Sequence, residues 1–68
     1  MGRGTTLRTL RAGRVILFKL RNRRGYAAIA LNNLTEGRTA AQAFQRLTHP
    51  LRRMGYALPA RLPAPRAV

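Results

Sequence analysis

The sequence contains no cysteine and no serine, and Glu36 is its only acidic residue among 68. Without cysteine, neither a disulfide nor a thiolate metal site can stabilise so short a chain. One histidine and one glutamate are too few ligands for a metal, so we expect no metal site. A chain of this length forms one domain at most, with a thin core and marginal stability.

The scarcity of catalytic residue types argues against an enzyme. Acid–base catalysis by two groups needs a pair of carboxylates, or a histidine with a carboxylate, and only His49 and Glu36 are present. The threonine and tyrosine hydroxyls lack an organised base that would activate them. We therefore expect no catalytic residue and no cofactor.

Long hydrophobic runs are also missing. The apolar runs Val15–Phe18 and Tyr26–Leu31 are too short to span a bilayer, and no signal-peptide-like apolar stretch follows the N-terminal arginines. We expect no transmembrane segment and no secretion by a signal peptide. The expected location is the cytoplasm or nucleoid of a cell, or the inside of a virus particle.

Basic residues, in contrast, are abundant. Thirteen arginines and Lys19, against the single carboxylate of Glu36, give a formal net charge of +13. A codon bias toward GC explains the preference for arginine over lysine, but not the near-absence of acidic residues. Such an excess of one sign repels itself unless a polyanion neutralises it. The expected partner is nucleic acid, together with other proteins of a larger assembly.

The N-terminal half predicts a β-hairpin. Val15–Leu20 is rich in β-branched and aromatic residues, and Tyr26–Leu31 resumes a strand-like pattern. Between them, Arg21–Gly25 predicts a loop of about four or five residues. Alanines are weak strand formers, so a helix over residues 26–31 is a competing interpretation. Thr5–Leu10 is a candidate edge strand, and Asn32–Arg38 is interpreted as a polar connection.

The C-terminal half predicts one amphipathic helix. Thr39 and Gln42 have the spacing of a capping box, which marks the start of a helix. At helical periodicity one stripe is apolar: Ala40, Ala43, Phe44, Leu47, Leu51 and Met54. The opposite face is polar: Arg38, Gln42, Gln45, Arg46, His49, Arg52 and Arg53. Pro50 predicts a kink or two short helices in line, and Gly55 predicts the end.

These elements predict a small α+β fold, with a hairpin or three-stranded sheet followed by a Pro-kinked helix. Residues 1–13 are expected to form a basic arm, 14–58 the domain, and 59–68 an extended tail rich in proline and arginine. The predicted core packs helix residues on one face of the strands: Phe44, Leu47 and Leu51 on Ile16, Phe18 and Ile29.

The candidate nucleic-acid-binding residues come from three segments: Arg3, Arg8 and Arg11 in the arm, Arg21, Arg23 and Arg24 at the hairpin tip, and Gln42, Arg46, Arg52 and Arg53 on the helix. Arginine binds phosphates or guanine edges, and glutamine reads adenine. An arginine-rich tip suits a phosphate backbone or a narrow minor groove. A solvated basic surface without a ligand is the alternative.

The pattern favours a non-catalytic nucleic-acid-binding protein that neutralises phosphates in a nucleoprotein assembly, with DNA slightly favoured over RNA. A hairpin followed by a helix resembles the sheet-plus-helix modules that read DNA with strands. No motif residue makes this resemblance specific, so it assigns no role to any residue of this chain. Two other classes remain open. One is a structural subunit of a virion or similar particle with a genome-facing basic surface. The other is a small basic inhibitor that binds an acidic groove on a larger protein.

Overall fold

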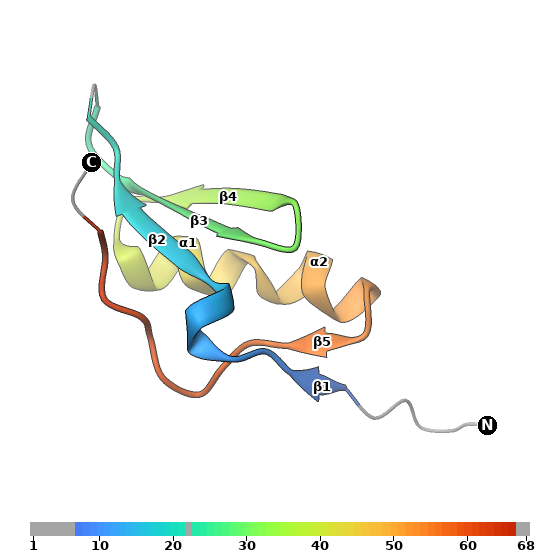
Figure 1. Cartoon of the computed structure of the whole chain (residues 1–68). Helices are drawn as coiled ribbons and strands as arrows, with labels where there is room; N and C mark the ends of the chain where they lie inside the picture. Colours follow the sequence, from blue (N-terminus) through green and yellow to red (C-terminus); the bar gives the residue numbers. More distant parts are fainter. Residues whose placement is uncertain (1–6, 22, 67–68) are drawn as a thin grey trace.

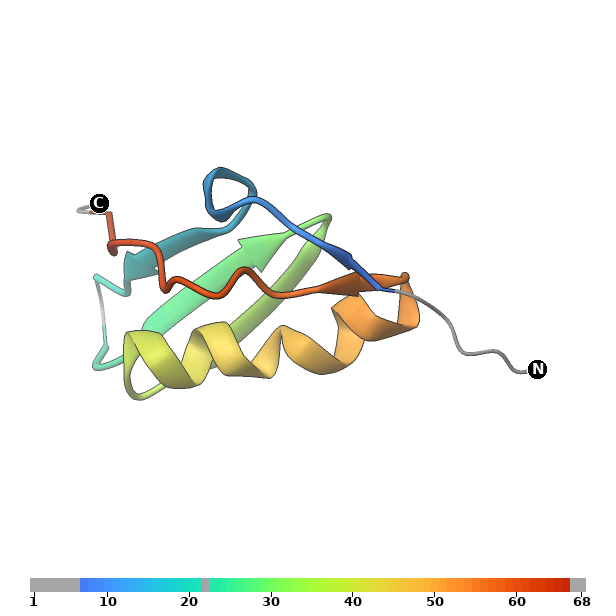
Figure 2. The same ribbon diagram turned by 90° about the horizontal axis from the view of Figure 1, so that it is seen from below.

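The computed structural model describes residues 7–21 and 23–66. They form a small α+β fold, as the sequence predicts: a three-stranded antiparallel sheet, then one bent helix of 14 residues, plus a small parallel pair of strands (Figure 1). Helices α1 and α2 lie together on one side of the sheet (Figure 2).

The sheet has the order β2-β3-β4, with β2 at Ile16–Lys19, β3 at Tyr26–Ala30 and β4 at Asn33–Gly37. The predicted hairpin is confirmed, and residues 26–30 form a strand rather than a helix. Asn32–Arg38 was predicted as a connection, and this prediction is wrong because β4 lies within it. The chain reverses tightly through Leu31 (φ 48°) and Asn32 (φ 66°), a left-handed geometry that asparagine tolerates and leucine seldom adopts.

The helix begins and bends where the sequence predicts. The backbone N–H of Gln42 donates to Thr39 Oγ1 at 3.0 Å, and the side-chain oxygen Gln42 Oε1 accepts from the backbone N–H of Arg38 at 2.7 Å. α1 spans Ala40–Arg46 and α2 spans Thr48–Arg53, with Leu47 at the junction. Pro50 falls in the first turn of α2, where its missing N–H costs no bond within that helix. The bend therefore lets one apolar stripe continue across the proline.

The core lies between the helix and one face of the sheet. Its buried residues are Leu10 and Val15 from the segment before β2, Leu17, Ala28 and Ala30 from the sheet, and Ala43, Phe44, Leu47 and Leu51 from the helix. The strand residues Ile16, Phe18 and Ile29 were predicted to face the helix, and this prediction is wrong. They are half-buried on the other face. Both faces of β2 are apolar, and the small alanines of β3 let the helix pack closely. Met54, predicted on the apolar stripe, is 50 % exposed.

A parallel pair of strands, which the sequence did not predict, joins the two ends of the domain. β1 at Arg8–Thr9 pairs with β5 at Tyr56–Ala57, after the helix ends at Gly55 with a φ of 89°. The candidate edge strand of the arm therefore pairs outside the main sheet; Thr5 and Thr6 lie outside the described residues. A short 3-10 helix, η1 at Ala12–Arg14, connects β1 to β2.

The proline-rich tail is extended and runs along the β2 edge of the sheet (Figures 1 and 2). Pro59 is buried, and the Arg66 N–H donates to the Leu17 carbonyl at 2.7 Å. This bond occupies part of the hydrogen-bonding edge of β2. The tail thereby blunts an edge that is otherwise open to pairing with another strand.

Candidate nucleic-acid interface

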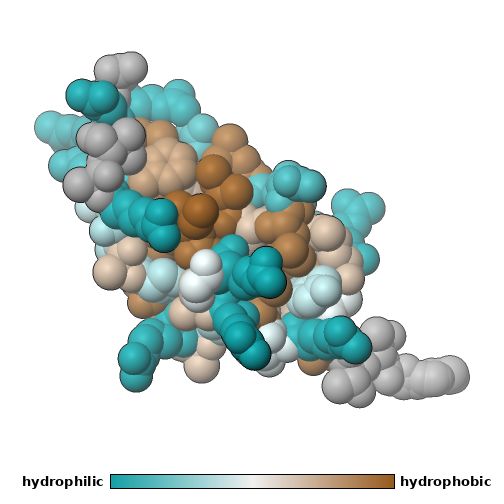
Figure 3. Space-filling model, viewed as in Figure 1, coloured by the Kyte–Doolittle hydropathy of each residue, from teal (hydrophilic) through white to brown (hydrophobic). Residues whose placement is uncertain are grey.

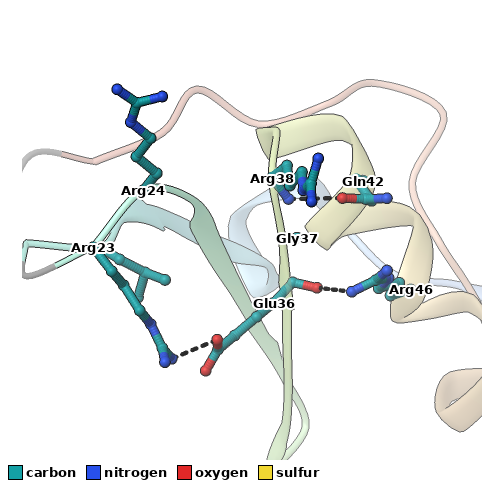
Figure 4. A pocket seen from close by; sticks show the side chains of 8 residues that line it. Arg23, Arg24, Glu36, Gly37, Arg38, Gln42 and Arg46 are labelled. Atoms are coloured by element: carbon teal, nitrogen blue, oxygen red, sulfur yellow. Dashed lines mark hydrogen bonds and ion pairs between the residues drawn. The ribbon is translucent and has the colours of Figure 1, made fainter.

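Arginines from three segments surround one hollow at the end of the sheet where the β2–β3 hairpin turns. This basic hollow has a volume of about 320 Å³ and is lined by Leu20, Arg23, Arg24, Glu36, Gly37, Arg38, Gln42 and Arg46. Figure 4 shows side chains from the hairpin, from β4 and from α1 around it. The hairpin tip and the helix face, which the sequence analysis treats as separate surfaces, thus meet at one site.

Two glycines make this meeting of elements sterically possible. A Cβ on Gly37 would lie 2.6 Å from the Ala43 backbone nitrogen, so α1 approaches β4 more closely than a side chain permits. Gly25, with φ at 129°, would place a Cβ 2.9 Å from the Gly37 carbonyl oxygen. Glycine at both positions therefore lets the hairpin turn and the start of α1 come together.

The single acidic side chain lies inside the basic hollow. Glu36 Oε1 accepts from Arg23 Nη2 at 2.6 Å, and the Glu36 backbone carbonyl accepts from Arg46 Nη1 at 2.7 Å (Figure 4). The paired side chains are 64 % exposed for Arg23 and 45 % exposed for Glu36. An exposed pair of this kind is worth about 0.2–1 kcal/mol. Because this pair is worth so little, a nucleic-acid phosphate can displace the Glu36 carboxylate from Arg23 at small cost.

Among the described residues, no hydrogen bond engages the guanidinium groups of Arg24 and Arg38. Arg24 extends away from Glu36 in Figure 4, and Arg38 joins β4 to α1 with an exposed side chain. Gln42 uses its side-chain oxygen in the helix cap, which leaves its amide NH₂ free to donate. Arginine and amide donors that line one hollow suit a phosphate group.

Of the remaining predicted residues, those that the structure describes do not line the basic hollow. Arg8 and Arg11 line a second depression together with Arg14, while Arg52 and Arg53 line a third beside the end of α2. Arg21 is exposed at the hairpin tip, and Arg3 lies outside the described residues. Basic side chains thus lie on several sides of the molecule, with the hollow as their densest gathering.

Four residues that line the hollow were not among the predicted site residues: Leu20, Glu36, Gly37 and Arg38. Glu36 and Arg38 are the two charged ones. Arg38 precedes the capping residue Thr39, so its position at the start of the helix follows from the capping box. The sequence gives less indication of the position of Glu36, because its place opposite Arg23 depends on β4 pairing with β3. β4 lies within Asn32–Arg38, the segment that the sequence predicts as a connection.

Comparison with known protein families, with curated proteins and with solved structures finds no match to this chain. None of the helices within residues 7–21 and 23–66 is long and apolar enough to cross a membrane. Across the same residues, no three histidine, aspartate or glutamate side chains gather as candidate metal ligands.

Proposed function

We propose that this protein is a non-catalytic nucleic-acid-binding protein that neutralises phosphates within a nucleoprotein assembly. The basic hollow is its principal phosphate site. The main support is the convergence of Arg23, Arg24, Arg38 and Arg46, which come from three separate segments, on one depression. Charge repulsion opposes this gathering in the free protein, and a bound polyanion relieves it.

Nucleic acid fits this distribution of charge better than a small anion does. The formal charge is +13, and further arginines line depressions at β1 and at the end of α2. A single small anion would neutralise only one of these clusters. A polymer of phosphates reaches several of them at once and releases its counterions as it binds.

Salt dependence is the direct test of this function. If about 5–8 phosphates are contacted, the logarithm of the affinity for duplex DNA should fall against the logarithm of salt concentration with a slope of about −4 to −7. Fluorescence anisotropy with a labelled oligonucleotide, repeated from low to moderate salt, measures this slope. A slope shallower than about −2 contradicts phosphate neutralisation as the basis of binding.

Removing the carboxylate from the hollow should strengthen binding. A phosphate must displace the Glu36 side chain from Arg23, so Glu36→Gln should tighten binding by about fivefold, which corresponds to about 1 kcal/mol. The Arg46 contact should survive, because it is made to the Glu36 backbone carbonyl.

The matched control for this variant is Ala60→Lys, which also raises the net charge by one. Ala60 is exposed in the tail and does not line the hollow. Anisotropy titrations of both variants at one salt concentration separate the local effect from total charge. Equal tightening by the two variants would show that Glu36 does not compete with phosphate.

A further inference from the structure

The sheet face turned away from the helices is apolar and, across the described residues, partly exposed, although Ala27 on it is buried; we call it the open face. Cross-strand pairing places Ile16, Ile29 and Leu34 side by side on this open face, with Phe18 next to them on β2. Leu34 is 60 % exposed, and the other three are half-buried. Figure 3 shows an apolar area over the strands with hydrophilic side chains around it. A contiguous apolar patch on so small a protein marks a binding surface.

This open face is continuous with the basic hollow. Phe18, Ala27 and Glu36 are cross-strand neighbours, and Glu36 lines the hollow. Leu20, two residues beyond Phe18, also lines it. Two strand residues span about 7 Å. Phe18 is therefore close enough to the basic hollow for a strand whose phosphate lies there to reach its ring.

We propose that the open face stacks unpaired bases, so that the protein prefers single-stranded nucleic acid to duplex. This inference rests on the proposed function and names the form of nucleic acid that the site takes. The Phe18 ring supplies the stacking surface, and Ile16, Ile29 and Leu34 extend it for the neighbouring base or sugar.

Two other occupants fit the open face less well. A duplex keeps its bases stacked on one another and presents phosphates and polar groove edges, which an apolar surface would desolvate without offering partners. A second copy of this chain would bring another formal charge of +13 against the first. A single-stranded nucleic acid carries both phosphates and unpaired bases. One ligand therefore binds the basic hollow through a phosphate and the open face through a base.

Tryptophan fluorescence tests this inference directly. The chain has no tryptophan, so Phe18→Trp places a single reporter on the open face. Titration with oligo(dT) should quench its emission by stacking, and a DNA hairpin of equal nucleotide number should not. Leu62→Trp is the matched control, because Leu62 is 41 % exposed in the tail and lines neither the basic hollow nor the two other arginine-lined depressions. Its emission should change little with either ligand.

Phe18→Leu completes the test, because it keeps an apolar side chain on the sheet while removing the aromatic ring. Its affinity for oligo(dT) should fall about fivefold or more, and its affinity and salt slope for the DNA hairpin should match those of the parent. Circular dichroism confirms that the variant is folded.

Each contrary result has a distinct meaning. Equal affinity of the parent for both ligands, without quenching of tryptophan emission in the Phe18→Trp variant, overturns the stacking role and leaves the proposed function standing. A change of that emission with protein concentration alone shows that a second copy covers the face, and also overturns the inference. Failure of the parent to bind either ligand at low salt refutes the proposed function itself.

Discussion

Gly37→Ala should remove most of the stability of this protein. The new Cβ would lie 2.6 Å from the Ala43 backbone nitrogen and 2.9 Å from the Gln42 Cβ, and neither neighbour is the mobile end of a long side chain. Relief requires α1 to move away from β4, which opens the core between them. Overpacking of this kind costs about 2–3 kcal/mol, close to the whole stability of about 3–5 kcal/mol expected for so small a core.

Thermal unfolding followed by circular dichroism measures this effect. A loss of about 2 kcal/mol should lower the Tm by about 10 °C or more in a domain of this size. Gly13→Ala is the control, because Gly13 is exposed in η1 and an added Cβ there meets nothing within 4 Å. Its Tm should stay unchanged or rise slightly. If the Gly37→Ala variant has the same Tm as the parent, α1 does not approach β4 as closely as described.

Replacing one arginine from each segment of the basic hollow should cause the largest loss of nucleic-acid binding. The triple variant Arg23→Ala, Arg38→Ala and Arg46→Ala removes three guanidinium groups from one depression. At about 1 kcal/mol for each lost phosphate contact, the affinity should fall about 100-fold. The salt slope on duplex DNA should become shallower by up to about three units.

The control for this variant removes the same charge from elsewhere. Arg8→Ala, Arg52→Ala and Arg61→Ala change three exposed arginines that do not line the basic hollow. Anisotropy titrations across a series of salt concentrations compare the two triples at equal net charge. We expect a clearly larger loss from the hollow triple. Equal losses would show that total charge governs binding and that the hollow is not a distinct site.

Local features of the sequence were enough to predict several elements of the fold. The hairpin between β2 and β3 followed from a β-branched run and a charged turn, and the helix start followed from the Thr39 and Gln42 capping box. The bend at Leu47 followed from Pro50, whose missing N–H interrupts the hydrogen-bond pattern of a helix, and the buried helix stripe followed from the spacing of Phe44 and Leu47. Each of these patterns depends on residues a few positions apart, so it can be recognised in the sequence itself.

Contacts between distant segments were decided only by the tertiary structure. Both faces of β2 are apolar, so its alternation alone cannot show that Leu17 faces the helix and Phe18 does not. β4 was not predicted because the turn between β3 and β4 holds Leu31 in a left-handed conformation, which a leucine in the sequence does not indicate.

The candidate site shows the same division between local and tertiary information. The sequence alone establishes the excess of arginine and the single glutamate. Pairing of β4 with β3 brings Glu36 opposite Arg23, and the lack of a Cβ at Gly37 brings Arg46 beside them. Charge composition is a property of the chain, whereas the hollow depends on backbone pairing and close approach across long sequence separations. For that reason only the folded structure shows the arginines of three segments as one site.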